Sequence, residues 1–202
     1  MHILLAHALR TEAGLIKQHF PQATRLLAEH GYEMFQLKDG IKLFKTGMGL
    51  DRTEAAFNKY VDPENLDLII HFGVSGSLAE TLPAQTLIQG IGFKAVGKPT
   101  IRIKIPDLSA KLELPQLDFY SSIQAIADEP ARVHAQATGT SAVDMESYAV
   151  AAFAQSWNIP LLSLRCISDR AGASTSEDFK QHFGKAAEIL QHFILKQVLT
   201  FF

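Results

Sequence analysis

Acidic residues stand beside apolar segments at several points of the chain, where they could act as general acids or bases. Glu12 comes shortly after an apolar N-terminal segment, and Asp169 follows the apolar residues 161–167. Asp144 and Glu146 are two residues apart, so an extended backbone puts them on one side and a helix separates them by about 200°. We expect one of this pair to enter a site. The alternative for each acid is a helix cap or a surface charge.

Glycine-rich or small polar residues occur where three predicted strands end. These segments are residues 46–49, 73–77 and 168–170. Ligands bind beyond the carboxyl ends of strands in open α/β sheets, and glycines let the backbone approach a ligand closely. The segments are therefore candidate ligand-binding turns, with plain tight turns as the alternative. Residues 47–52 lack the third glycine of a dinucleotide fingerprint and do not form a phosphate-binding P-loop.

Apolar runs alternate with segments of helical spacing along the chain. Strands are predicted at 3–8, 66–72, 87–93 and 161–167, and Asp39-Gly40 predicts a hairpin that joins 32–37 to 41–46. Helices are predicted at 12–20, at 52–60 and from Ser176 onward, whereas 140–153 begins extended and becomes helical. Residues 94–117 are interpreted as loops and short strands. This alternation predicts an α/β fold, a central mixed sheet flanked by helices, in a single domain over residues 1–202.

Composition excludes several classes of protein. The 202 residues carry a net charge of −2, so no strong basic field attracts nucleic acid. Cys166 is the only cysteine, which excludes an internal disulfide, and its apolar neighbours predict a buried, inert thiol. The N-terminus has no basic region typical of a signal peptide, and no run approaches about 18 apolar residues. We expect a cytoplasmic protein without a membrane span.

Motifs for other kinds of catalysis are missing from the sequence. The eight histidines have no paired-ligand spacing, so no metal is expected. No Gly-x-Ser-x-Gly segment occurs, which argues against a serine hydrolase. We interpret the aromatic residues of the last predicted helix as core or subunit contacts.

Residues 143–151, Val-Asp-Met-Glu-Ser-Tyr-Ala-Val-Ala, together with Arg165-Cys166-Ile167-Ser168-Asp169 after a proline-headed strand, form a specific pair of motifs. The pair resembles the nucleoside phosphorylase family, in particular its methylthioadenosine/S-adenosylhomocysteine nucleosidase branch. Residues 8–13, 45–49 and 71–78 resemble further segments of that family in the same order. The resemblance runs from residue 1 to about residue 185 and implies the three-layer fold of these proteins.

The resemblance implies cleavage of the N-glycosidic bond of a purine nucleoside, adenine above all. Asp169 would protonate or hydrogen-bond N7 of the base, with Ser168 positioning it. Glu146 would accept hydrogen bonds from the ribose hydroxyls and stabilise positive charge on the sugar. Glu12 would deprotonate the attacking water. The other residues expected around the substrate are Met145, Arg165, Met48, Gly49, Ser75, Gly76 and Ile126.

The base-binding part of the site departs from the family pattern. Residues 121–128 occupy the place of the base-stacking segment, yet they lack its aromatic residue. Phe119 or Tyr120 could replace it. Residues 138–144, which lead into the motif at 143–151, and residues 127–130 are more similar to the hopanoid-associated subgroup. The substrate of that subgroup would carry a large apolar lipid.

Three functions stay open at this point. The first is hydrolysis without a cofactor, which the carboxylate of Glu12 favours because it would repel phosphate. The second is phosphorolysis, with inorganic phosphate as co-substrate held by Arg10, Arg52 and Ser75. The third is a non-catalytic nucleoside-binding protein of the same fold. The resemblance also implies a homodimer or higher homo-oligomer.

Overall fold

Strand β5 (Leu68–Ser77) is the centre of the fold in the computed structural model, which describes residues 1–172 and 175–202. It pairs in parallel with β1 (Ile3–His7) and with β10 (Leu161–Arg170), and antiparallel with β9 (Ala142–Asp144). Its residues are almost all buried, because helices cover both faces of the sheet. The remaining strands are β2 (Thr24–Glu29), β3 (Tyr32–Lys38), β4 (Ile41–Lys45), β6 (Leu87–Ala95), β7 (Ile101–Arg102) and β8 (Gln116–Ser121).

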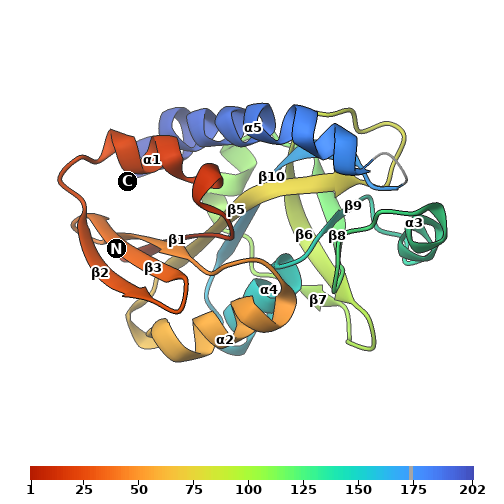
Figure 1. The fold of residues 1–202 in the computed structure, drawn as a ribbon. Helices are drawn as coiled ribbons and strands as arrows, with labels where there is room; N and C mark the ends of the chain where they lie inside the picture. The colour runs from red at the N-terminus through yellow and green to blue at the C-terminus, as the bar shows by residue number, and fades with distance from the viewer. Residues whose placement is uncertain (173–174) are drawn as a thin grey trace.

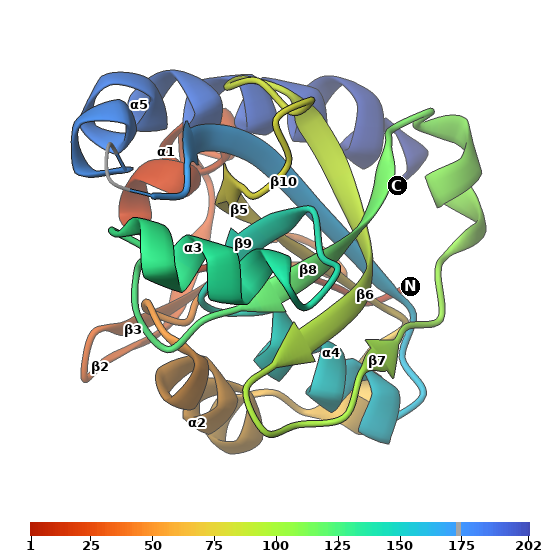
Figure 2. The ribbon, with the colours of Figure 1, turned by 90° about the vertical axis from the view of Figure 1, so that its right-hand side faces the viewer.

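The ten strands form one mixed sheet with two parts. Strand β5 pairs with β9, β9 with β8, β8 with β6, and β6 with β10. Because β10 also pairs with β5, these five strands close into a ring (Figure 2). Strands β1, β4, β3 and β2 extend from β5 as an open wing, and the short strand β7 pairs with β6. The predicted hairpin is present as the antiparallel pair β3–β4, whose turn holds Gly40 at a φ of 73°.

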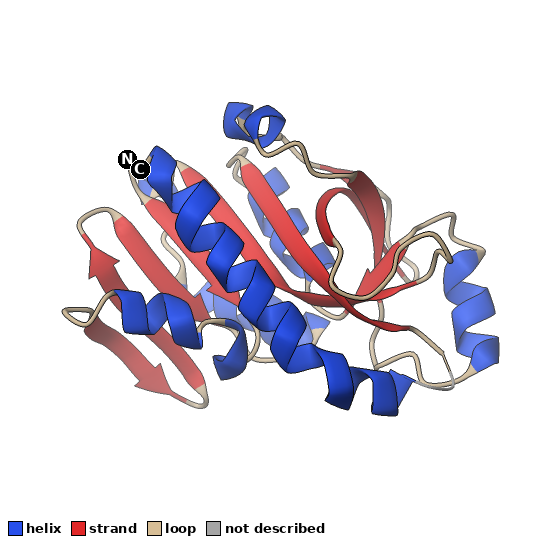
Figure 3. Ribbon diagram, turned by 90° about the horizontal axis from the view of Figure 1, so that it is seen from above, coloured by secondary structure: helices blue, strands red, loops and turns tan. Residues whose placement is uncertain are grey.

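Helices cover the sheet on both faces, as Figure 1 shows. Helices α1 (Gly14–His19) and α5 (Thr175–Phe193) lie on one face, and α2 (Leu50–Tyr60) and α4 (Ser147–Ser156) lie on the other. Seen from above in Figure 3, α5 is the long helix that lies over the strands. Helix α3 (Glu129–Gln136) covers β9 and the end of β5 at the side of the molecule. Short helical turns are η1 (Arg10–Glu12), η2 (Pro63–Asn65), η3 (Asp107–Lys111), η4 (Ile194–Val198, a π-helix) and η5 (Leu199–Phe201).

Each face of the sheet has its own apolar core. Alternation along β1 sends Ile3 and Leu5 to the α1/α5 side, whereas Leu4 and Ala6 pack on the α2/α4 side. The expected α/β fold with a mixed sheet and flanking helices is thereby confirmed. In the described part of the chain, no helix is long and apolar enough to cross a membrane.

Several predicted boundaries were wrong. Residues 73–77 and 168–170 were expected to be turns, but they are the extended ends of β5 and β10, which hold each other in parallel pairing. The first predicted helix is split, because residues 10–12 form η1 and α1 begins only at Gly14. Strand β2 and helix α3 were not predicted.

Candidate active site

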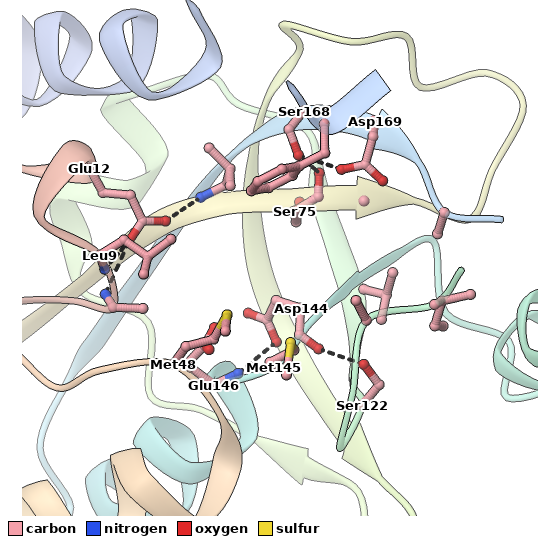
Figure 4. Close-up of a pocket in the computed structure, with 18 residues that line it drawn as sticks. Leu9, Glu12, Met48, Ser75, Ser122, Asp144, Met145, Glu146, Ser168 and Asp169 are labelled. Carbon is pink, nitrogen blue, oxygen red and sulfur yellow. Dashed lines mark hydrogen bonds between the residues drawn. The ribbon is translucent and has the colours of Figure 1, made fainter. Parts of the chain in front are cut away.

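A pocket of about 620 Å³, open part included, lies at the carboxyl ends of β1, β5 and β10. Figure 4 shows its two sides: Glu12, Ser75, Ser168 and Asp169 lie along one, facing Met48, Met145, Glu146 and Ser122. The sequence predicted eleven site residues. Of these, the pocket wall holds Glu12, Met48, Ser75, Gly76, Ile126, Met145, Glu146, Ser168 and Asp169, and Gly49 and Arg165 lie outside it.

The short turn η1 holds the carboxylate of Glu12 at the pocket. Oε2 accepts hydrogen bonds from the backbone N–H groups of Ala8 and Leu9, at 3.1 and 2.8 Å, and Oε1 accepts one from Val74 at 3.1 Å. A Cβ at Gly73 would lie 2.7 Å from Oε1, so only glycine permits this approach. Burial raises the pKa of Glu12, while the three N–H donors oppose that rise.

A bulge in β10 brings Ser168 and Asp169 to the pocket together. The pairing with β5 shifts by one residue between Ile167 and Asp169, so Ser168 is the extra residue. Consecutive side chains of a regular strand point to opposite faces, and a bulge re-aims them. Both side chains therefore line the pocket, and Ser168 Oγ donates a hydrogen bond to Asp169 Oδ2 at 2.6 Å. The contact fixes the orientation of the carboxylate.

Glu146 is the residue immediately before α4, and its side chain enters the pocket. The backbone N–H of Gly49 donates to its Oε1 at 2.7 Å, so Gly49 holds Glu146 from behind instead of lining the wall. Gly49 has a φ of 104°, a conformation that favours glycine. Burial and the nearby charge of Asp144 raise the pKa of Glu146 to about 8. The two neighbouring methionines, Met145 and Met48, give this side an apolar surface.

Arg165 is buried behind the pocket and binds Asp144. Its Nε and Nη2 donate to Asp144 Oδ2 at 3.1 and 2.8 Å, and Nη2 also donates to Ser147 Oγ at 2.6 Å. Nη1 donates to the backbone carbonyls of His71 and Leu164. Arg165, which was expected to support the site, thus lies behind the pocket wall and bonds to other residues of the protein. Asp144 reaches the pocket wall, but Arg165 and two serine hydroxyls occupy its oxygens.

Neither arginine of the anticipated phosphate site lines the pocket. Arg10 donates to Glu33 Oε1 through Nε and Nη2, at 2.8 and 2.6 Å. Arg52 donates to the backbone carbonyl of His30 at 2.7 Å and lies over the Tyr32 ring. The described lining residues include no lysine or arginine. Ser75 is on the wall, and its buried Oγ has no hydrogen-bond partner among the residues that the structure describes.

Phe179 on α5 also lines the pocket, a position that the sequence did not predict. Its ring lies 4.6 Å from that of Phe183. The two aromatic residues expected to replace the base-stacking residue do not reach the site: Phe119 packs on Phe93 in the core, and Tyr120 packs near α3. The helical spacing of the aromatic residues was visible, but spacing alone does not tell a core residue from a pocket residue.

Metal-binding groups are not assembled here. Among residues 1–172 and the described side chains after 174, no three histidine, cysteine or carboxylate side chains gather as a metal ion would need. Cys166 is buried, and burial raises its pKa to about 12.

Residues 118–200 match the sequence profile of the phosphorylase superfamily. The C-terminal part of the chain is therefore similar to that superfamily. The matched region includes Glu146 and Asp169, whereas Glu12 lies outside it.

The chain is also similar to known proteins along most of its length. The futalosine hydrolase of Streptomyces coelicolor is 25% identical over 200 residues, covering 85% of each chain. The native structure of the futalosine hydrolase of Helicobacter pylori has a TM-score of 0.89 at 19% identity, covering 99% of this chain and 98% of that one. A 5′-methylthioadenosine/S-adenosylhomocysteine nucleosidase mutant of H. pylori, solved with 5′-methylthioadenosine in its active site, has a TM-score of 0.87 at 17% identity and 98% coverage of both chains. These structural matches show that the fold is shared.

Proposed function

We propose that this protein hydrolyses the N-glycosidic bond of a purine nucleoside, with adenine as the preferred base. The observation that carries the proposal is the meeting of Glu12, Glu146 and Asp169, from three separate elements, in one pocket without a described cation on its wall. Burying three carboxyl groups in one pocket costs free energy, and clusters of this kind are typical of functional sites. The named activities of the relatives, futalosine hydrolase and methylthioadenosine nucleosidase, agree with it.

Each carboxylate has a distinct task in this reaction. The bond to the base breaks as positive charge develops on the ribose, so the base must accept a proton and the sugar must be stabilised. Asp169, oriented by Ser168, donates a proton or hydrogen bond to N7 of the purine. Glu146 accepts from the ribose 2′ and 3′ hydroxyls and stabilises the developing charge. These two groups lie on opposite sides of the pocket, which leaves the nucleoside between them.

Glu12 takes the proton of the attacking water. Its carboxylate is fixed by three backbone N–H groups, so it needs no rearrangement to act. A pKa raised by burial makes it a stronger base than an exposed glutamate. The unpartnered Oγ of Ser75, on the neighbouring strand, supplies a hydrogen-bonding group for the same water or for a ribose hydroxyl.

Water is the proposed nucleophile in preference to phosphate. A phosphate dianion would meet the carboxylate of Glu12, the base of this reaction, while Arg10 and Arg52 are engaged with Glu33 and with His30 outside the pocket. Like charges repel each other strongly in a buried pocket of low dielectric, which opposes the binding of phosphate. Apolar side chains around the opening, Leu9, Met48 and Phe179, favour an apolar substituent at the 5′ position.

The test is adenine release from a panel of 5′-substituted adenosines, with and without phosphate, using the full chain. Release in phosphate-free buffer with the free 5-substituted ribose as the sugar product supports the proposal. Release that requires phosphate and yields the 1-phosphate of the 5-substituted ribose would replace it by phosphorolysis. Binding of adenine that raises the melting temperature, without turnover of any nucleoside, would favour a non-catalytic binding protein.

The proposal includes a homodimer or higher homo-oligomer. Met48 and Ile123 stay 56% and 75% exposed, and Met48 lies on the pocket wall itself. Exposed apolar side chains beside a site favour cover by a second copy. The mass of the protein in solution, from sedimentation, tests this.

A further inference from the structure

A second cleft lies beside η1 and α1, over the wing of the sheet. It has a volume of about 1250 Å³, open part included, and it shares no lining residue with the candidate active site. Its walls come from β1, η1 and α1 on one side and from β2, β3 and β4 on the other. A cleft of this size is large enough for a small organic molecule.

Positive charge dominates the lining of this cleft. Four cationic side chains and one carboxylate face it: Arg10, Lys17, Arg25 and Lys45, against Glu33. His7 also lines it, but burial lowers the pKa of His7 to about 4, so its ring is neutral at pH 7. The imbalance is local, because the whole chain has a net charge of −2.

The single carboxylate neutralises only part of this charge. Glu33 Oε1 accepts from Arg10 at 2.6 Å and lies 3.2 Å from Lys45 Nζ. Among the described residues, neither Lys17 nor Arg25 lies within ion-pair distance of a carboxylate. Two cations are therefore available to an incoming anion, and Arg10 stands next to them with an exposed side chain.

The floor of the cleft is apolar. Phe35 and Leu43 line it from β3 and β4, and both belong to the core on the α1/α5 side. Lys17 Nζ lies 3.9 Å from the centroid of the Phe35 ring, so its ammonium group is held over an aromatic face. Cations above an apolar floor match a ligand that has an apolar body and anionic oxygens.

We propose that this cleft binds a small organic dianion, a phosphate monoester or a dicarboxylate with an apolar, aromatic body. The anionic oxygens contact Lys17 and Arg25, with Arg10 as a third contact. They draw the Lys17 ammonium group off the Phe35 ring, so that the apolar body takes its place on the floor of the cleft. The guanidinium groups supply paired donors that match both phosphate and carboxylate oxygens. The site is independent of the proposed nucleosidase activity and requires no turnover.

The position of η1 links the two cavities. Within this one turn, Arg10 faces the cationic cleft and Glu12 faces the candidate active site. A ligand that draws Arg10 away from Glu33 would shift η1, the turn of three residues that also includes Glu12. Binding itself is the quantity to measure first, because it does not depend on the activity of Glu12.

The test is calorimetric titration of the wild-type protein with phenyl phosphate and, separately, with phthalate. Phenol and inorganic phosphate serve as the neutral and the non-aromatic comparison. We expect saturable binding of at least one dianion with a dissociation constant of roughly 1 mM or tighter, and binding about tenfold weaker for inorganic phosphate and for phenol. The better of the two dianions identifies the anionic group.

Location in the cleft is tested with the double variant Lys17→Gln/Arg25→Gln. It should weaken binding of the preferred dianion by at least about tenfold with an unchanged melting temperature, since both side chains are exposed. The matched control is Lys104→Gln, an exposed lysine outside both pockets, which should leave binding unchanged. Absence of saturable binding, equal affinity for inorganic phosphate, or equal binding by the double variant and wild type would each overturn the proposal.

Discussion

Arg165 Nη2 lies 2.8 Å from Asp144 Oδ2, and both side chains are only 1% exposed. This buried ion pair joins β10 to the strand that leads into Glu146. A charge in such a place is stable only while its partner and its hydrogen bonds are present. The pair thus fixes the backbone from which one side of the candidate active site projects.

Replacing Arg165 with Met should lower the free energy of unfolding by about 3–5 kcal/mol, because Asp144 would keep a buried charge without its partner. The double variant Arg165→Met/Asp144→Asn should recover part of that loss. Denaturant unfolding at pH 7 measures both. A double variant no more stable than Arg165→Met would contradict the explanation by an unpaired charge.

Asp169→Asn should reduce adenine release by about 10²–10⁴-fold, because the amide cannot donate the proton that the carboxylic acid supplies. The fold should persist, since Asn keeps the size of the side chain and an oxygen to accept from Ser168. Single-turnover rates and melting temperatures separate the two effects. A rate close to wild type would rule out Asp169 as the acid.

Glu12→Gln should reduce hydrolysis by about 10²–10⁴-fold while adenine still binds. The amide oxygen still accepts a backbone N–H, but the side chain no longer takes a proton from water. The measurement pairs kcat with the dissociation constant for adenine. Loss of binding in proportion to the loss of turnover would show that Glu12 shapes the pocket and is not the base.

Glu146→Gln should make the folded protein more stable at pH 8. The pKa of Glu146 is raised from 4.5 to about 8 in the folded state, so between these values the folded chain holds a proton that the unfolded chain has released. The free energy of unfolding therefore falls as pH rises through this window. The substituted glutamine side chain carries no such charge, and its amide oxygen can still accept from the backbone N–H of Gly49.

The stability gained by Glu146→Gln at pH 8 should be on the order of a few kcal/mol and should vanish toward pH 4.5. Melting curves of both proteins from pH 4.5 to 8.5 measure it. Parallel curves across this range would show that Glu146 does not titrate as proposed. The same variant should lose activity at pH 8 and above, where the ionised carboxylate of Glu146 would stabilise positive charge on the ribose.

Elements with a strong local pattern were predictable from the sequence. The hairpin around Gly40 has a turn signal, and α2, α4 and α5 have helical apolar spacing. Strand β2 was missed because both its faces are largely exposed, so no alternation marks it. The closed ring of strands depends on pairing between β10 and both β5 and β6, which are distant in sequence, and no local pattern encodes it.

Site residues were placed by motif, and their roles depend on geometry that the motif does not contain. The extra residue at Ser168 changes which side of β10 the next side chain faces, yet nothing in its composition marks a bulge. The motif places Arg165 near the site but does not say whether its side chain lines the pocket. In the structure Arg165 is buried, and its guanidinium group donates hydrogen bonds to other residues of the protein. The helical spacing of Phe179 is that of a core residue, but in the structure Phe179 lines the pocket.

Closure of the five-strand ring has a consequence for self-association. Strands within a closed ring have no unpaired edge, and in the described sheet β2 is the long strand left open on one side. The exposed Leu26 of β2 would favour pairing of this edge with a strand of a second molecule. The irregular pairing next to Arg25, and the charges of Arg25 and Glu29, oppose such pairing. The aggregation behaviour of this protein should accordingly depend on these few residues of β2, far from the pocket that the ring helps to form.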